Sequence, residues 1–535
     1  MNAENGVSGA TGGPNRRWWT LFAMCFALFM IMLDNTIVNV ALPSIQRSLQ
    51  TTPENLQWTV DAYILSFAVL ILLGGKLGDR FGRKRMFLVG LTIFTLASAA
   101  CALATSDHQL IASRVVQGAG GALLNPLSLA ILVTAFPRRQ VPTAIGIWAG
   151  ISSLGLAVGP LAGGFLVERF SWSAVFWVNV PIGMIAAAVA LWAVSESRDP
   201  ETRHLDLVGA GLATGGLFAL VWALIETGTH AWGSAYTLGF LAAAAVLLGL
   251  FIAWERRAAD PMVPLGFFRR PAFATSAAVV LLVGFSLFGV IYFITLYFQN
   301  VKGYSPFQAG IRSLPMTVMI TMLAPLAGRL NTKMGARAQM SIGMLLVSGG
   351  MFGLSHIQVA SSYNAIWPFY ILVGAGMALT MPAVSATGMA AVDRDRSGIA
   401  SGVINANRQL GGALGIAVLG SVAATLTRDA WHEGLAQLPA ATQAAAEPLT
   451  GLVLGGQGRP IAALAGPQAQ TAALEAFVHG VSGAMLASSA LTLLAALVAF
   501  VGLRRLAPTP SVEPTAEADD GRQRRGAEEL EAPTR

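Results

Sequence analysis

The chain has 535 residues, of which 54% are hydrophobic and only 11% are charged, and its formal net charge is +7. Soluble domains carry about 25% charged residues, so this composition excludes a soluble globule and indicates a polytopic membrane protein. Two cysteines, Cys25 and Cys101, both fall in apolar runs, which excludes a disulfide framework and a cysteine metal site. No cofactor, metal or nucleic-acid partner is expected, and the lipid bilayer is the expected surroundings.

About fourteen apolar runs have the roughly 20 residues that a membrane helix needs. They lie at 18–41, 56–74, 85–104, 109–134, 141–167, 173–194, 206–225, 236–254, 273–299, 307–328, 338–355, 364–389, 398–425 and 479–503. The first run is too long for the apolar core of a cleavable signal. The polar segments at either end, 1–17 and 504–535, are expected to be disordered tails.

The positions of Lys and Arg indicate the orientation of the spans. If the N-terminus is cytoplasmic, five of the 34 basic residues lie in loops on the opposite side, three lie within spans, and the other 26 lie in cytoplasmic loops and tails. This asymmetry follows the positive-inside rule. Both termini are therefore expected in the cytoplasm, and segment 427–478 is expected outside it.

Three charged residues interrupt the apolar runs of the first half: Asp34, Asp61 and Arg114. At 1.5 Å per residue, all three lie roughly 8–14 Å below the outer surface. Because isolated charges are costly in a bilayer, they are expected to group around a wet cavity. Asp34 or Asp61 would carry a proton and Arg114 would modulate its release. The alternatives are structural ion pairs or, for Asp61, a solvated group at the interface.

A charged, glycine-spaced loop at residues 75–85 lies between the second and third runs. Asp79 is expected to bind the N-terminus of a helix in the other half, near Ser397, where the helix dipole favours an anion. The loop would then act as a cytoplasmic latch, whereas the plainer interpretation is anchoring by its positive charges. The candidate latch residues are Gly75, Asp79, Arg80, Gly82 and Arg83.

Glycines recur every four residues in the fifth run, at Gly155, Gly159 and Gly163, with Gly164 following and Pro160 between them. This spacing gives one smooth stripe along a helix, against which another helix can pack closely, and proline can bend the span. The stripe either serves packing alone or takes part in coupling.

The second half of the chain repeats the first. Gly118, Gly120 and Pro126 recur as Gly374, Gly376 and Pro382, at an offset of 256, and the 75–85 loop has a weaker echo 253 positions later. In that echo Thr332 replaces Asp79. Such duplication is typical of transporters. Two six-helix bundles, 18–194 and 270–503, are therefore expected to flank a two-helix insert at 195–269.

Between residues 261 and 392 the chain has no Asp or Glu. Carboxylate proton chemistry is therefore expected in the first bundle. A lipophilic cation would use Asp34 or Asp61 as its counter-charge, and an anion would use Arg312 or Arg408. The candidate substrate-cavity residues are Asn35, Asn39, Arg312, Asn405 and Arg408.

Taken together, these motifs resemble the 14-helix drug:proton antiporter subfamily of the major facilitator superfamily. The resemblance covers about 18–505 and rests on residues 33–43, 58–63, 75–85, 114–120 and 155–164. It implies the all-α major facilitator fold, in the inner membrane of a bacterial-type cell. It also implies proton-driven export of lipophilic, often cationic compounds by alternating access. The subfamily's fourth-helix arginine, here Arg114, is implicated in proton coupling, and 155–164 resembles its antiporter motif.

Two other functions fit the same fold: proton-coupled uptake of a nutrient, and a receptor that transports nothing. No Ser/His/Asp or Cys/His constellation occurs within the spans, and the P-loop motif is absent, so neither an enzyme nor an ATP-driven pump is expected. In a host with two membranes, segment 427–478 would suit a periplasmic adaptor.

Overall fold

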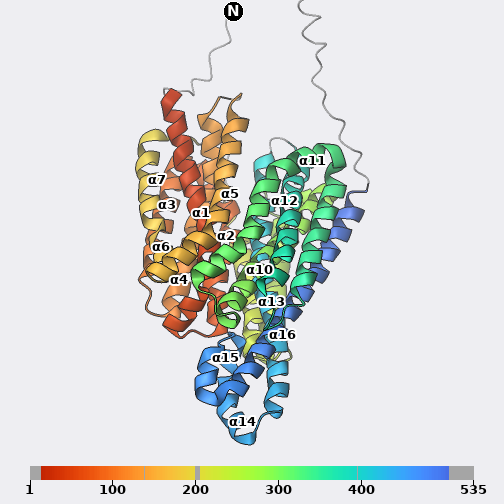
Figure 1. Ribbon diagram of the computed structural model, residues 1–535. Helices are drawn as coiled ribbons and strands as arrows, with labels where there is room; N and C mark the ends of the chain where they lie inside the picture. Colours follow the sequence, from red (N-terminus) through yellow and green to blue (C-terminus); the bar gives the residue numbers. More distant parts are fainter. Residues whose placement is uncertain (1–13, 138, 199–204, 394–395, 505–535) are drawn as a thin grey trace, which may run out of the picture.

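The computed structural model describes residues 14–137, 139–198, 205–393 and 396–504. Figure 1 shows two helical bundles side by side, with both ends of the chain on the same side. We call that side the terminal end, and the opposite side, where α14 and α15 lie, the cap end. The expected tails fall largely outside the described residues.

Within the described residues, all regular structure is helical. The first bundle contains α1 (Pro14–Leu49), α2 (Pro53–Phe81), α3 (Arg83–Ala102), α4 (Asp107–Ala135), α5 (Val141–Arg169), α6 (Ala174–Trp177) and α7 (Asn179–Ala193). The insert contains α8 (Leu207–Ile225), η1 (Glu226–Gly228), α9 (Ala235–Glu255) and η2 (Leu265–Arg269). The second bundle contains α10 (Pro271–Leu296), η3 (Tyr297–Val301), α11 (Pro306–Leu354), η4 (Tyr363–Ala365), α12 (Trp367–Ala390), α13 (Ser397–Ala436), α14 (Ala440–Ala446), η6 (Glu447–Leu449), α15 (Thr450–Leu454) and α16 (Gly458–Gly502).

Thirteen described helices are long and apolar enough to cross a membrane. The helix α11 is 49 residues long and breaks at Gly335, whose φ of 77° lies in the left-handed region that favours glycine. Its two segments correspond to two predicted spans, and α6 with α7 forms one. The fold is therefore that of about fourteen membrane helices, as the sequence predicted.

The duplicated glycines make the same contact in both bundles. A Cβ on Gly120 of α4 would lie 2.6 Å from the Phe94 nitrogen of α3. A Cβ on Gly376 of α12 would lie 2.8 Å from the Val347 nitrogen in the second segment of α11. Phe94 and Val347 are themselves 253 positions apart. The close approach of two neighbouring helices is thus repeated in the second half, which explains why both glycines occur.

The two bundles meet at the cap end through α5 and α11. A Cβ on Gly164 would lie 2.6 Å from the Phe307 Cα, and a Cβ on Gly310 would overlap the Pro160 carbonyl oxygen. Glu168 Oε2 also accepts a hydrogen bond from the Phe307 nitrogen at 3.2 Å, which caps the start of α11.

At the terminal end the same two helices lie apart. Eighteen residues make five helical turns, so Gly146 lies on the same face of α5 as Gly164, and Gly328 on the same face of α11 as Gly310. A Cβ on Gly146 or Gly328 would meet nothing within 4 Å. Figure 1 likewise shows the bundles apart at this end. The α5/α11 seam is therefore closed at the cap end and open at the terminal end.

The second seam between the bundles, α2 against α13, is covered by the insert. On α8, Phe218 and Trp222 pack their rings on Trp58 of α2 at 5.5 and 5.4 Å. At the end of α8, Thr227 hydrogen-bonds Ser421 of α13. The insert thus contacts both bundles, so it bridges this seam.

Segment 427–478 folds into a small helical cap. Its own apolar core is built from Trp431, Leu435, Ala446, Val453 and Ile461, together with residues of α16. The loop after α15 returns to the bundles, where the Asn300 amide donates to the Gly455 oxygen at 2.9 Å. The cap therefore rests on the closed end of the two bundles.

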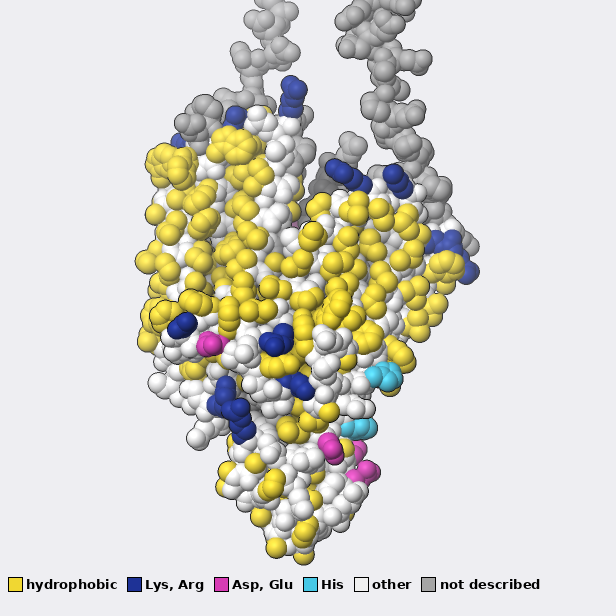
Figure 2. Space-filling model, in the orientation of Figure 1, with side chains coloured by type: hydrophobic (Ala, Val, Ile, Leu, Met, Phe, Trp, Pro, Cys, Tyr) yellow, Lys and Arg dark blue, Asp and Glu magenta, His cyan; other side chains and the backbone are white. Residues whose placement is uncertain are grey.

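The surface of the molecule matches a bilayer. Figure 2 shows hydrophobic side chains over the middle of both bundles, with Lys and Arg side chains at the terminal end and a second group toward the cap end. Large apolar side chains exposed on the described helices include Leu191, Trp192 and Val246, each 60% exposed. Large apolar side chains at this exposure are expected to face lipid.

We predict that Gly310→Val opens the cap end. The added side chain would push α5 and α11 apart, because overpacking a contact that stayed closed would cost about 1–3 kcal/mol. With cysteines 25 and 101 replaced by alanine, spin labels at Ile147→Cys and Leu326→Cys should move closer together at the terminal end. Gly328→Val, on the same face but with free space around it, is the matched control. Equal distance distributions in the two variants would contradict this account of the seam.

Candidate functional site

The centre of the first bundle holds a buried ion pair. Asp34 on α1 is 0% exposed and Arg114 on α4 is 1% exposed. The Arg114 Nη1 donates to Asp34 Oδ2 at 2.6 Å, and its Nε donates to the Thr59 carbonyl oxygen of α2 at 3.1 Å. The structure therefore brings together two of the three predicted charges.

Neutral side chains complete the hydrogen bonding of the pair. Gln117, one turn after Arg114, donates to Asp34 Oδ1 at 2.9 Å and accepts from Arg114 Nη1 at 2.6 Å. Asn179 of α7 donates to the same Asp34 oxygen at 3.1 Å. Ser98 of α3 accepts from both amides, at 2.6 and 3.2 Å. Four helices of the first bundle thus supply side chains to one polar cluster, which we call the Asp34 cluster.

Aromatic rings cover the arginine. The Arg114 guanidinium lies 4.1 Å from the ring centre of Tyr63 and 5.8 Å from that of Phe176. A cation over an aromatic face is stabilised, more so away from water. The cluster is thus a charged centre with hydrogen-bonded and aromatic walls, which offsets part of the cost of burying two ions.

The glycine stripe of α5 packs directly on the helix that carries Asp34. A Cβ on Gly155 would lie 2.9 Å from the Phe29 oxygen of α1, and one on Gly163 would lie 2.8 Å from an Ile37 side-chain carbon. Gly159 faces Thr36 between them. The neighbouring Pro160 and Gly164 face α11 instead. One helix therefore connects the Asp34 cluster to the seam between the bundles.

Asp61 lies on the other side of α2. Residues two positions apart in a helix are separated by about 200° around its axis. Asp61 therefore points away from Thr59 and Tyr63, which contact Arg114. It faces α10, where Tyr292 lies within range of its charge. Both Asp61 oxygens are buried without a described hydrogen-bond partner. The sequence suggests that all three charges group around one cavity. The placement of Asp61 does not support that grouping.

The proposed cavity residues separate into distinct places. Asn35 and Asn39 donate to carbonyl oxygens of their own helix, at 3.1 and 3.0 Å. Asn405 of α13 donates across the bundle interface to Asn125 of α4 at 3.0 Å, and Arg408 donates to Asn405 at 3.0 Å. These two residues therefore form a polar bridge between the bundles.

Arg312 lies far from this bridge, in the second turn of α11 at the cap end. Its guanidinium packs over the rings of Tyr304 and Tyr363, at 3.9 and 5.6 Å. Its Nη1 donates to the Gln308 oxygen of its own helix at 3.2 Å. The structure thus places Arg312 beside aromatic residues at the cap end, apart from the Asp34 cluster.

The 75–85 segment, expected as a loop, instead forms the last turns of α2 and the first residues of α3, with Gly82 between them. Its described contacts lie within the first bundle and the insert. Asp79 accepts from Arg83 at 2.7 Å, and Lys76 pairs with Asp260 at 3.0 Å. Gly82 has φ 107°, and beside it Glu196 accepts from the Lys84 and Arg85 nitrogens. Arg80 lies over Phe81, and Gly75 approaches Pro126 of α4. In this conformation Asp79 is paired within its own loop, and the side chains of Ser397 and Thr332 lie outside the described residues.

Several residues of the site escaped the sequence reasoning. Gln117, Ser98 and Asn179 hold Asp34 in place, yet each looked like an ordinary polar residue in an apolar run. The signal available for Gln117 was its position three residues after Arg114, which puts both on one helix face. No group of three or more His, Cys, Asp or Glu among the described residues is arranged to hold a metal ion.

We predict that the Asp34–Arg114 pair is energetically coupled. Asp34→Asn or Arg114→Gln alone leaves a buried charge uncompensated, which should lower the free energy of unfolding by about 3–5 kcal/mol. The double variant should lose clearly less than the sum of the two. Thermal unfolding of the purified protein in detergent measures these losses. Asp79→Asn, which breaks a partly exposed pair, should cost no more than about 1 kcal/mol. Additive losses in the double variant would mean that the two charges do not stabilise each other.

Comparison with known proteins places this geometry in a family. The family model described as Major Facilitator Superfamily matches residues 24–416. The chain is 35% identical over 496 residues to the tetracenomycin C resistance and export protein of Streptomyces glaucescens, covering 92% of each chain. It is 39% identical over 406 residues to the multidrug resistance protein Stp of Mycobacterium tuberculosis, covering 76% of this chain and 75% of that protein.

Solved structures agree with this fold. A bacterial homolog of the human lysosomal transporter Spinster, in an inward-facing and unoccupied conformation, is 18% identical, with a TM-score of 0.66. The match covers 92% of this chain and 98% of that one. With the described bundles, the internal repeat and the family match over most of its length, the chain belongs to the Major Facilitator Superfamily.

Proposed function

We propose that this protein is a proton-coupled antiporter that exports lipophilic drugs or metabolites, foremost cationic ones, by alternating access. The observation that carries the proposal is the fully buried Asp34–Arg114 pair, whose α1 helix packs against α5, the helix that also contacts α11 at the seam between the bundles. The printed names of the relatives, which are resistance and export proteins, support export over uptake of a nutrient and over a receptor.

The mechanism follows from how the Asp34 cluster is held. In this conformation Arg114 donates to one Asp34 oxygen and two amides donate to the other, so both oxygens are occupied by donors. Protonation therefore requires that these donors move away. The glycine stripe of α5 lies against the α1 turns that carry Asp34, and the same helix contacts α11. Opening and closing of the α5/α11 seam would shift α1 and change which form of Asp34 is favoured.

Such coupling makes transport an exchange. When the seam opens to the outside, Asp34 would take up a proton as the substrate leaves. When it opens to the cytoplasm, Arg114 would again pair with Asp34, the proton would be released and substrate would enter. The protein thus moves its substrate without converting it chemically, and it needs no cofactor.

The proposed orientation places the terminal end in the cytoplasm and the chain in the inner membrane of a bacterial-type cell. The excess of Lys and Arg in the tails and in the loops on the side of the tails supports it. The cap would then lie outside, where a periplasmic adaptor would bind in a host with two membranes.

Leu464, 62% exposed on the cap, is a candidate contact. Leu464→Asp should weaken crosslinking of the cap to periplasmic proteins and leave transport in vesicles unchanged.

Transport in inside-out vesicles tests the proposal. With an acidic lumen, wild-type protein should concentrate a fluorescent lipophilic cation, and collapse of the proton gradient should stop it. Asp34→Asn should lose at least about tenfold in rate, because a neutral amide carries no proton. The control is Glu226→Gln, an acid of the insert that lies outside the cluster.

The outcomes separate the candidate functions. Dye movement that is insensitive to the proton gradient would exclude antiport. Dye movement in the opposite direction would favour uptake. If folded wild-type protein moves no dye under either gradient, cationic export is wrong, and acidic lipophilic compounds are the next substrates to test in the same vesicles.

A further inference from the structure

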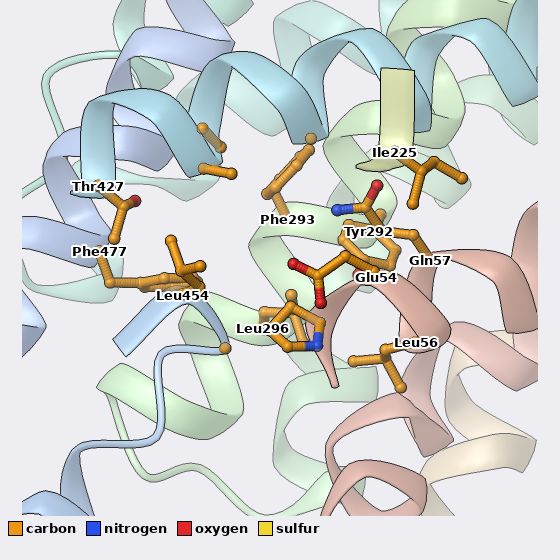
Figure 3. Close-up of a pocket in the computed structure, with 15 residues that line it drawn as sticks. Glu54, Leu56, Gln57, Ile225, Tyr292, Phe293, Leu296, Thr427, Leu454 and Phe477 are labelled. Atoms are coloured by element: carbon orange, nitrogen blue, oxygen red, sulfur yellow. The ribbon is translucent and has the colours of Figure 1, made fainter. Parts of the chain in front are cut away.

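A small cavity lies at the cap end, between the two bundles and beneath the cap. It measures about 20 Å³, enough for about one water molecule. Figure 3 shows Glu54 and Gln57 of α2 on one side, Tyr292 and Leu296 of α10 beside them, and Leu454 and Phe477 toward the cap. The cavity walls therefore come from three parts of the molecule that the proposed transport cycle moves relative to one another.

The polar wall of this cavity belongs to one face of α2. Glu54, Gln57 and Asp61 are spaced by three and four residues, which places them along the same side of a helix. This face points toward α10 and α13, where Tyr292 lies within range of the charges of both Glu54 and Asp61. On this face two carboxylates follow each other inward from the cap end, about 10 Å apart along the helix axis, with the amide of Gln57 between them.

These acceptors are buried without compensation. Glu54 and Gln57 are each 7% exposed, and Asp61 is 0% exposed. The Gln57 oxygen and both Asp61 oxygens have no described hydrogen-bond partner. None of the residues that line the cavity is Lys, Arg or His. Buried acceptors without donors are costly, so this face suits a ligand that brings positive charge or protons.

Other charged groups near the start of α2 face a different way. Asn55 and Thr51 donate to Asp107 of α4, at 2.8 and 2.9 Å, and Asp107 pairs with His108. Position 55 is 100° from Glu54 around the helix. From the second bundle, Tyr292 is the titratable side chain that lines the cavity, beside the neutral Thr427. The cavity face is thus acidic, and its acids lack a basic neighbour within the lining.

The cap controls access to this face. Its Leu454 and Gly455 line the cavity, and Gly455 is held by Asn300 of η3. A Cβ on Gly455 would overlap Gln46 of α1, so the loop also touches the first bundle. A separation of the bundles at the cap end would detach this loop from α1 and open the α2 face to the outer solution.

We propose that Glu54, Gln57 and Asp61 form an outer proton-loading site of the antiporter. This inference rests on the proposed function and adds the route by which protons enter. When the cap end opens, a hydronium ion gives its proton to the Glu54 carboxylate and leaves as water. The Glu54 carboxylic acid then passes the proton to the Asp61 carboxylate along water molecules beside Gln57, which enter when the cap end opens. Glu54 returns to its ionised form, and Asp61 supplies the proton that Asp34 takes up.

A purely structural role for Glu54 makes different predictions. An acid in the first turn of a helix is stabilised by the helix dipole, and Glu54 occupies that position in α2. Its replacement would then lower stability and affect every transport mode alike. A proton-loading role affects net proton-driven transport and leaves substrate-for-substrate exchange intact, because exchange needs no net proton uptake.

The test uses right-side-out proteoliposomes of the full chain loaded with a fluorescent lipophilic cation, with the outer pH set at 6, 7 or 8 and the lumen kept more alkaline than the outside by the same pH difference each time. Glu54→Gln should slow proton-driven efflux by about tenfold or more at pH 8. The loss should be smaller at pH 6, where hydronium is plentiful. Glu54→Asp should recover part of the rate, and Asp61→Asn should lose efflux at every pH. Glu226→Gln, an acid of the insert that accepts from Thr229, is the matched control and should behave like wild type.

Dye exchange under equal pH keeps the outcomes distinct. Normal exchange together with slow, pH-dependent net efflux in Glu54→Gln supports the loading site. Wild-type net efflux in Glu54→Gln, equal losses in exchange and net efflux, or efflux driven by a sodium gradient in place of protons would each overturn it. If the wild type shows no gradient-driven efflux, the proposed function itself has failed.

Discussion

The ion pair between Asp34 and Arg114 is the constraint on which the first bundle depends. Neither charge reaches water, so each relies on the other and on the surrounding amides, and loss of one leaves the other unpaired at a cost of several kcal/mol. Side chains of α1, α3, α4 and α7 converge on this pair. These helices are thereby fixed to one another, and the bundle is expected to move as a unit. In the second bundle, packing and neutral polar contacts such as Ser348 with Ser489 take the place of a central ion pair.

Close glycine contacts connect this unit to its partner. The stripe of α5 lies so near α1 that no side chain fits between them, while Gly164 on the same helix lies equally near α11. Contacts between two backbones leave little room for independent movement, because packed interiors transmit strain. A change at the seam therefore reaches the Asp34 cluster through a single helix. The outer acidic face of α2 has no such contact with that cluster, which separates the place where protons would enter from the place where Arg114 acts.

The sequence predicted the number of spans and singled out Asp34 and Arg114, which the structure pairs, because charges in apolar runs have few uses. Counting residues positions Asp61 along its span but does not predict the direction in which its side chain points. Depth follows from counting residues, whereas the rotation of a helix about its axis is decided by its neighbours. The same limit applies to Arg312, whose ring partners come from loops distant in sequence, and to Asp79, which pairs one turn away with Arg83. The role proposed for Glu54 could be inferred only from the structure, which shows the three elements that surround it.

The insert makes the two seams unequal. It holds α2 through its aromatic side chains and α13 through the hydrogen bond between Thr227 and Ser421, whereas the α5/α11 seam has no such bridge in the described residues and is already parted at one end. Two bodies joined along one edge rotate about that edge. The axis of alternating access would then run beside α2 and α13, and the widest displacement would occur at α5 and α11. A chain bridged along one seam alone should therefore open as an asymmetric wedge.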